Sequence, residues 1–133
     1  MENNSTESLM QRYSRELHED LKIDELSIKD KSMMVPIIKH KWVSIQMNHK
    51  SQLKKLEFAK KKHIKEYVAS APVALSKTAL EQAALNDPKL AAIQEKIEEL
   101  ELVVEYLEKI EKAISSLTFD CKNVIDLQKL ETT

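Results

Sequence analysis

The sequence predicts an all-α protein with two long antiparallel helices and short helices at its N- and C-terminal ends. The first observation is that its 133 residues include three prolines and no glycine. The tight turns of β-hairpins need positive φ angles, which glycine supplies, so a hairpin-rich sheet is disfavoured. The second observation is that apolar residues recur at helical spacing in two long stretches on either side of a proline-containing connector. A chain of this length supports one domain, residues 1–133.

The first half of the chain contains two predicted helices. Within an N-terminal helical region, residues 1–35, Ser5 or Thr6 can cap a helix in which apolar residues recur every four positions from Leu9 to Leu21. Pro36 suits the first turn of the next helix, because its missing N–H is not needed there. Residues 36–70 are therefore predicted to form one long basic helix of roughly 50 Å, stopped by Pro72.

The second half begins with a connector, residues 71–87, in which Ser76 or Thr78 can start a short helical turn. Asn86-Asp87-Pro88 combines a capping residue with proline at the first helical position, and it marks the start of a long acidic helix over 88–117. Thr118-Phe119-Asp120 is expected to break that helix. Residues 118–133 are then predicted to form a short amphipathic C-terminal helix.

Each long helix carries an apolar seam. In residues 88–117 the seam has the 3-4 spacing of a heptad, and it is wide enough either for one face of a helical hairpin or for a surface shared with neighbouring subunits. The basic helix has a matching seam that includes Trp42 and Tyr67, both predicted to pack there although either ring could stack on a base. The acidic seam consists of Leu90, Ile93, Ile97, Leu100, Val104 and Leu107, and shifts to Ile110, Ile114 and Leu117.

Charge is distributed unevenly along a chain whose formal net charge is −1. Residues 36–65 hold nine lysines and one acid, Glu57, whereas residues 95–112 hold seven glutamates and three lysines. At 100° per residue, Lys50, Lys54, Lys61 and Lys65 fall within about 60° of one another, about 120° from the seam, and Lys55 and Lys62 flank them. We call Lys50, Lys54, Lys61 and Lys65 the lysine ridge. Such a ridge can be a solvated face, a track for nucleic-acid phosphates, a surface for acidic lipids, or a partner for the glutamate-rich helix.

Several kinds of chemistry lack the residues that they require. A P-loop, a Rossmann fingerprint and an EF-hand loop all need glycine, and a single cysteine, Cys121, allows no intrachain disulfide. The four histidines are scattered without metal-ligand spacing, so we expect no metal site, no catalytic residue and no cofactor. The polar N-terminus and the lack of any long apolar run predict no membrane span and a location in a reducing cytoplasm.

Residues along most of 15–131 have a familiar order and spacing. They are "DLKID" at 20–24, Lys41-Trp42, Lys50, Leu53, Glu57, Lys60-Lys61 and Ile64-Lys65, and later Phe119, Lys122, Asp126 and Glu131 in "FDCKNVIDLQKLE". In this order they resemble the UvsY family of tailed-phage recombination mediators, although residues 70–90 have no counterpart.

The resemblance implies a small helical protein that forms a ring-like homo-oligomer of about six or seven subunits and acts in the host cell cytoplasm. Such mediators bind single-stranded DNA without sequence preference. They help to load a phage RecA-like recombinase onto strands covered by the phage single-strand-binding protein, and they hydrolyse nothing. The family's C-terminal segment contributes to oligomerisation, which here implicates Phe119, Val124, Leu127 and Leu130.

The family's DNA-binding motif is a lysine, any residue, and then an arginine. The lysine falls on Lys65, but the arginine position is occupied by Tyr67. Lys61 and Lys62, one turn earlier, can supply the charge while Tyr67 stacks on a base. The predicted DNA contacts are therefore Lys50, Lys54, Lys61, Lys62, Lys65 and Tyr67. The competing hypothesis is a structural helical-hairpin or coiled-coil oligomer without a nucleic-acid role, whose lysines pair with acidic faces.

Overall fold

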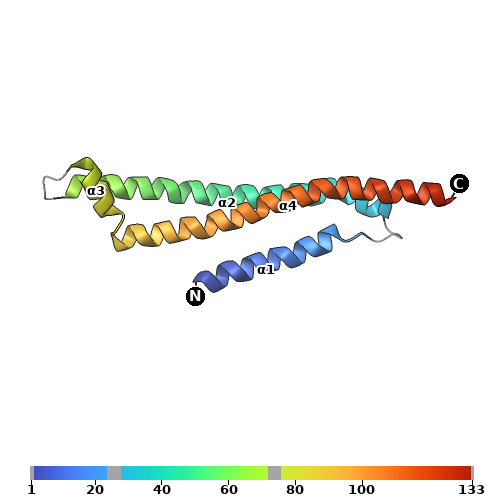
Figure 1. The fold of residues 1–133 in the computed structure, drawn as a ribbon, viewed down its shortest axis with the longest axis horizontal. Helices are drawn as coiled ribbons and strands as arrows, with labels where there is room; N and C mark the ends of the chain where they lie inside the picture. The colour runs from blue at the N-terminus through green and yellow to red at the C-terminus, as the bar shows by residue number, and fades with distance from the viewer. Residues whose placement is uncertain (1, 24–27, 72–75, 133) are drawn as a thin grey trace. The chain divides into compact units, whose positions relative to one another are not determined.

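The computed structural model describes residues 2–23, 28–71 and 76–132, and these residues form four helices without a strand (Figure 1). The helices are α1 (Glu2–Leu21), α2 (Ile28–Ser70), α3 (Lys77–Ala84) and α4 (Pro88–Thr132). The expected all-helical fold is confirmed. The chain divides into two compact units, each containing part of α2 and of α4: unit 1 is Met1–Met47 with Val103–Thr133, and unit 2 is Asn48–Leu102.

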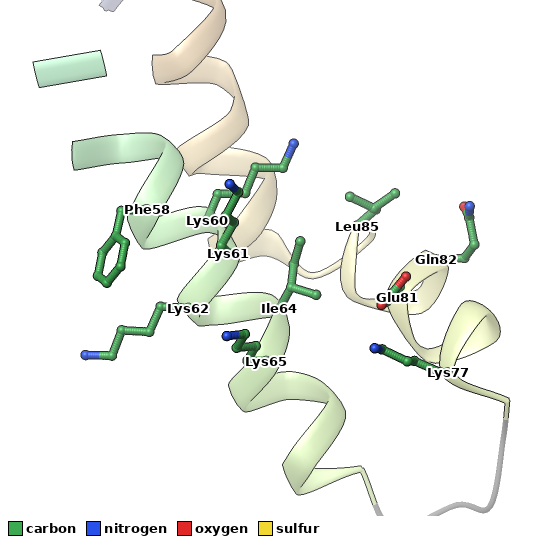
Figure 2. Close-up of a pocket in the computed structure, with 10 residues that line it drawn as sticks. All are labelled: Phe58, Lys60, Lys61, Lys62, Ile64, Lys65, Lys77, Glu81, Gln82 and Leu85. Atoms are coloured by element: carbon green, nitrogen blue, oxygen red, sulfur yellow. The ribbon is translucent and has the colours of Figure 1, made fainter. Parts of the chain in front are cut away.

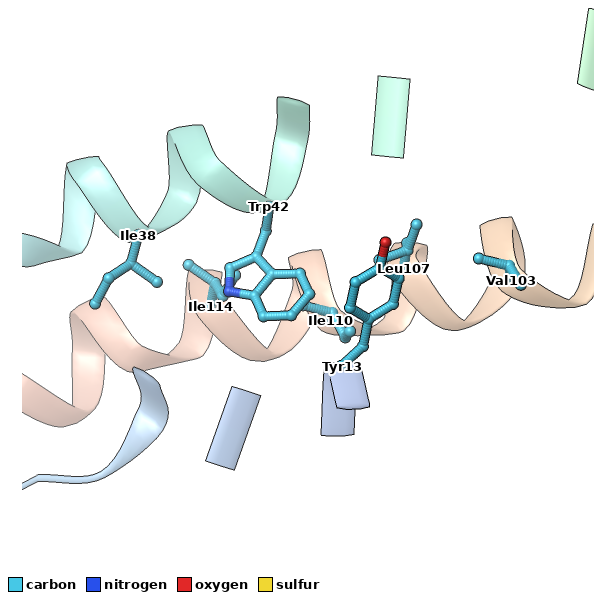
Figure 3. Close-up of a cluster of buried hydrophobic side chains, with 7 residues drawn as sticks. All are labelled: Tyr13, Ile38, Trp42, Val103, Leu107, Ile110 and Ile114. Carbon is cyan, nitrogen blue, oxygen red and sulfur yellow. The ribbon is translucent and has the colours of Figure 1, made fainter. Parts of the chain in front are cut away.

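Unit 1 is held together by a cluster of buried apolar side chains from α1, α2 and α4. Figure 3 shows Trp42 of α2 lying over Ile110 and Ile114 of α4, with Tyr13 of α1 beside it. The Tyr13 and Trp42 rings meet edge to face, with their centroids 5.7 Å apart. Full burial of one large apolar side chain contributes about 1.5–3 kcal/mol, so this cluster makes a large contribution to the stability of unit 1. Its members are Tyr13, Ile38, Trp42, Val103, Leu107, Ile110 and Ile114.

The prediction that Pro36 starts the long basic helix is wrong, because α2 begins at Ile28 and contains Pro36 in its interior. A proline at such a position costs about 3 kcal/mol or more through a lost hydrogen bond and a steric clash. Burial on both sides offsets this cost. Ile28 and Val35 are buried in a second cluster with Leu117 and Cys121 of α4, and Ile38 belongs to the first cluster.

The expected break at Thr118-Phe119-Asp120 is also wrong, since α4 continues to Thr132 and there is no separate helix over 118–133. The apolar seam explains the continuity. Leu117 and Cys121 are both buried in the second cluster, and Val124 packs against it, which extends the 3-4 spacing beyond the expected break. No proline or glycine interrupts these residues.

Unit 2 consists of the second part of α2, helix α3 and the first part of α4. Its two long segments are antiparallel, because Lys60 of α2 donates a hydrogen bond to Gln94 of α4 at 2.8 Å whereas His63, further along α2, pairs with Asp87 just before α4. Ser76 caps α3 as predicted, since its hydroxyl accepts a hydrogen bond from the Ala79 N–H at 3.2 Å. The starts of α3 and α4 match the prediction, and α2 ends at Ser70, although Pro72 lies outside the described residues.

Candidate nucleic-acid interface

The second part of α2 presents the predicted lysine ridge. Lys54, Lys61 and Lys65 are exposed and lie within about 40° of one another around the helix. Lys62 is also exposed, on the flank of the ridge. Lys50 is half-buried and already has an interaction partner. Three of the four ridge ammonium groups are therefore on the surface.

Two neighbouring residues of α2 are used within unit 2 instead. Lys60 reaches Gln94, and His63 reaches Asp87, so both side chains tie α2 to the beginning of α4. Lys61 and Lys65 lie one turn apart on the ridge, and like charges at this spacing destabilise a helix by about 0.2–0.5 kcal/mol. Lysine itself is a good helix former, which limits the cost. A polyanion bound along the ridge would relieve the remaining repulsion.

A groove of about 640 Å³ lies between α2 and α3 within unit 2. Figure 2 shows Ile64 of α2 and Leu85 extending into the space between the two helices, and the Lys77 side chain of α3 reaching toward α2, where Lys65 also lines the groove. Glu81 of α3 is the acid of this lining. The groove therefore has an apolar floor and a cationic edge, a combination suited to an anion that also carries an apolar group.

Lys77 is absent from the sequence-based set of DNA contacts. The sequence does carry a partial signal, because the Ser76 cap fixes where α3 begins and Lys77 is its first residue. The sequence does not predict that α3 packs beside Ile64, and this packing places Lys77 in the same groove as Lys61 and Lys65 (Figure 2). Packing of α3 thus adds a cation from another part of the chain to the interface.

The three aromatic residues of α2 occupy three different environments. Trp42 is 2% exposed in the first core cluster, so it packs as predicted and cannot stack on a base in this conformation. Tyr67 is half-buried and lies with the seam, about 120° or more from Lys61 and Lys65. Its predicted DNA contact remains a prediction. Phe58, by contrast, is 71% exposed beside the ridge.

The lysines of α2 that belong to unit 1 have a different role. The Asp20 carboxylate accepts hydrogen bonds from Lys41 Nζ at 2.9 Å and from Trp42 Nε1 at 2.8 Å. Lys41 also pairs with Glu16 at 3.5 Å. Partial burial lowers the pKa of Lys41, but the hydrogen bond and the attraction of Asp20 and Glu16 outweigh it, so the net shift is upward. Lys41 therefore fastens α1 to α2.

The candidate metal ligands and the single cysteine were the side chains of interest for chemistry in the sequence. Within the described ranges, no group of three or more His, Cys, Asp or Glu side chains could hold a metal ion. Cys121 is buried, and burial together with the nearby Asp120 raises the pKa of its thiol, which makes it a packing residue rather than a nucleophile. No helix among the described residues is long and apolar enough to cross a membrane.

The residues predicted to mediate oligomerisation are mostly on the surface of unit 1. Phe119, Leu127 and Leu130 are exposed, whereas Val124 is half-buried against the second cluster. The sequence did not predict a second group of exposed apolar residues, which lies on α2 around and after Pro36. That group comprises Met33, Met34, Ile37 and Met47, all exposed. Both groups therefore leave apolar side chains in contact with solvent on unit 1.

The fold and the interface together define a small helical protein with a cationic helix face suited to a polyanion, and with separate exposed apolar residues. The model of the UvsY family, described as "Recombination, repair and ssDNA binding protein UvsY", matches residues 16–133. This match covers well over half of the chain. The chain belongs to the UvsY family.

Solved structures support the same fold. The recombination mediator protein UvsY of bacteriophage T4, in its lattice type IV crystal, matches with a TM-score of 0.81 and 16% identity, over 92% of this chain and 98% of that chain. Its lattice type II crystal gives a TM-score of 0.78 at 16% identity, over 92% and 97% of the two chains. At this identity the likeness shows the fold alone. No sequence among the curated proteins matches this chain.

Proposed function

We propose that this protein is a non-enzymatic recombination mediator that binds single-stranded DNA without sequence preference. The observation that carries the proposal is the exposed lysine face of α2 in a chain of a family described as single-stranded-DNA-binding. The contacts are Lys54, Lys61, Lys62 and Lys65, with Lys50 at one end and Lys77 in the adjoining groove. Lysine makes point-charge contacts with phosphates and lacks the planar fork with which arginine reads guanine, so the binding does not depend on sequence.

The proposed action follows from repetition of this face. In a ring-like homo-oligomer, several copies of the ridge hold one strand, which gives avidity without strong single contacts. The exposed apolar residues of unit 1, including Phe119, Leu127 and Leu130, form the contacts between subunits. The assembly acts in the host cell cytoplasm. It holds the strand in a conformation that a RecA-like recombinase captures, and it displaces the single-strand-binding protein.

The test is the variant K61A/K62A/K65A, which replaces three lysines of α2 that line the groove and which we call the groove-end variant. If each subunit neutralises about three phosphates of a single strand, the log–log salt slope of the wild type is about −2 per subunit. The variant should lose most of its affinity for oligo(dT) and show a shallower slope. Anisotropy titrations across salt concentrations measure both, and light scattering reports whether the oligomer stays intact.

The matched control is K89A/K96A/K112A, which removes the same charge from exposed positions on α4. This control should retain most of the affinity. Equal losses in both triple variants would show that only net charge matters, and a wild-type affinity that does not change with salt would contradict the electrostatic proposal. A groove-end variant that disassembles without losing intrinsic DNA affinity would support the purely structural alternative.

A further inference from the structure

We propose that Phe58 is a base-stacking platform, a DNA-contact residue that binds the face of one nucleobase while the surrounding lysines bind the adjacent phosphates. This inference rests on the proposed single-stranded DNA binding and adds a second kind of contact to it. Phe58 lies on α2 within unit 2, and its side chain is 71% exposed. Figure 2 shows its ring projecting from α2 beside Lys62 and free of α3.

The neighbours of Phe58 on the helix surface are cationic. Residues three and four positions away share a helix face, and for Phe58 these are Lys54, Lys55, Lys61 and Lys62. All four are exposed. On the helix surface Phe58 is therefore flanked by two lysines one turn before it and two lysines one turn after it, about 4.5–6 Å away along the helix axis on each side.

Single exposed apolar residues are common and need no explanation by themselves. The surroundings distinguish Phe58 from the exposed apolar residues of unit 1. By helical spacing Met33 and Met34 share a face of α2 with Ile37, and Leu127 shares a face of α4 with Leu130, so each exposed side chain has an exposed apolar neighbour. An apolar partner surface covers such residues at little cost. Placed on Phe58, the same partner would have to desolvate several ammonium groups without pairing them.

A nucleotide satisfies both parts of this surface at once. Its base has an aromatic face that stacks on a phenyl ring, and its phosphates accept the charge of lysines on either side. Every base has such a face, so stacking preserves binding without sequence preference. The site is thus complementary to single-stranded DNA, whose bases are free to turn outward, and not to a duplex whose bases are already stacked.

The experiment compares Phe58→Leu, Phe58→Tyr and wild type on oligo(dT) and on an abasic strand of equal length. Leucine keeps an apolar side chain but removes the aromatic face. Stacking on one base is worth about 1–3 kcal/mol, so F58L should weaken oligo(dT) binding by about 5- to 150-fold per site. F58Y should restore it. On the abasic strand, wild type and F58L should bind alike, and the salt slope should be the same for all three proteins because no phosphate contact is removed.

The outcomes separate this inference from the proposed function. If F58L binds oligo(dT) as tightly as wild type while K61A/K62A/K65A does not, the stacking proposal is overturned and the electrostatic one stands. If wild type itself fails to bind either strand, the proposed function fails first. If F58L changes the mass of the assembly in light scattering, Phe58 contacts a second copy of the chain, and stacking is again overturned.

Discussion

The two units of the chain share the same two long helices but differ in the side chains that α2 exposes. In unit 1, α2 and α4 bury two apolar clusters and still leave methionines, leucines and Phe119 on the surface. In unit 2, α2 turns lysines outward and is tied to the beginning of α4 by polar contacts of Lys60 and His63. A continuous helix can thus change its surface chemistry along its length while its seam persists. This difference is consistent with the proposal that unit 1 carries the contacts between subunits and unit 2 the contacts with a strand.

The largest effect should follow from charging the exposed apolar surface of unit 1. Leu127→Glu with Leu130→Glu should convert the proposed oligomer into smaller species, because each carboxylate would lose its hydration at the proposed subunit contact. The helix content should not change, since both leucines are exposed. Light scattering with circular dichroism checks both expectations.

The matched control is Leu102→Glu, at an exposed leucine of α4 that belongs to unit 2. This variant should keep the wild-type mass. If L102E disassembles the protein and the unit 1 variant does not, the assignment of assembly to unit 1 is wrong.

A smaller but still large effect is expected in the core. Ile110 is fully buried in the first cluster, so Ile110→Ala should lower the free energy of unfolding by about 2–5 kcal/mol. Ile93 of unit 2 is only half-buried, and Ile93→Ala should cost less than Ile110→Ala. Urea unfolding at a fixed protein concentration measures the difference. Equal losses would indicate that unit 2 depends on apolar packing as much as unit 1 does.

The smallest effect concerns pH. His49, buried on α2 at the beginning of unit 2, has a pKa below its ordinary value of 6.5 because burial disfavours the charged ring, although a hydrogen bond with Gln52 opposes the shift. Between pH 6.5 and the lower pKa of the folded state, the unfolded chain therefore binds more protons at His49 than the folded chain does. The contribution of neutral His49 to the free energy of unfolding is fully present above pH 6.5, and it falls as the pH drops through this range.

His49→Gln should flatten this pH dependence, as measured by thermal unfolding on either side of this range. The matched variant is His40→Gln, at an exposed position of α2. H40Q should retain the wild-type difference between the two pH values. If H49Q loses as much stability at low pH as wild type does, a group other than His49 causes the pH dependence.

Sequence periodicity predicted most of this fold because the seams are local patterns. The absence of glycine, the Ser76 cap and the Asp87-Pro88 boundary all act within a few residues, and each prediction agrees with the structure. The two errors arose where contacts between distant segments outweigh local preference. Pro36 resembles a helix start until Ile28 and Val35 are seen packed on α4, and the polar residues near Phe119 resemble a break until Leu117 and Cys121 are seen buried.

The candidate interface shows the same division. Helical geometry alone placed Lys54, Lys61 and Lys65 on one exposed face, because their relative positions depend only on 100° per residue. The half-burial of Lys50 depends on contacts outside this spacing, and so does the position of Lys77, which is set by how α3 packs. Phe58 lies among lysines in the sequence, and its 71% exposed side chain distinguishes it from a core residue.

The hydrogen bonds of Asp20 have a consequence for recognising distant relatives. One carboxylate oxygen of Asp20 accepts hydrogen bonds from both the Lys41 ammonium and the Trp42 indole N–H. An aspartate near the end of a first helix and a later Lys-Trp pair therefore hold that helix against the second one. These residues belong to the segments by which the chain resembles its family. A remote sequence that shares only them would carry the signature of a docked first helix. The lysines that we propose to contact DNA lie further along the second helix, so the docking residues alone would not indicate whether such a relative has them.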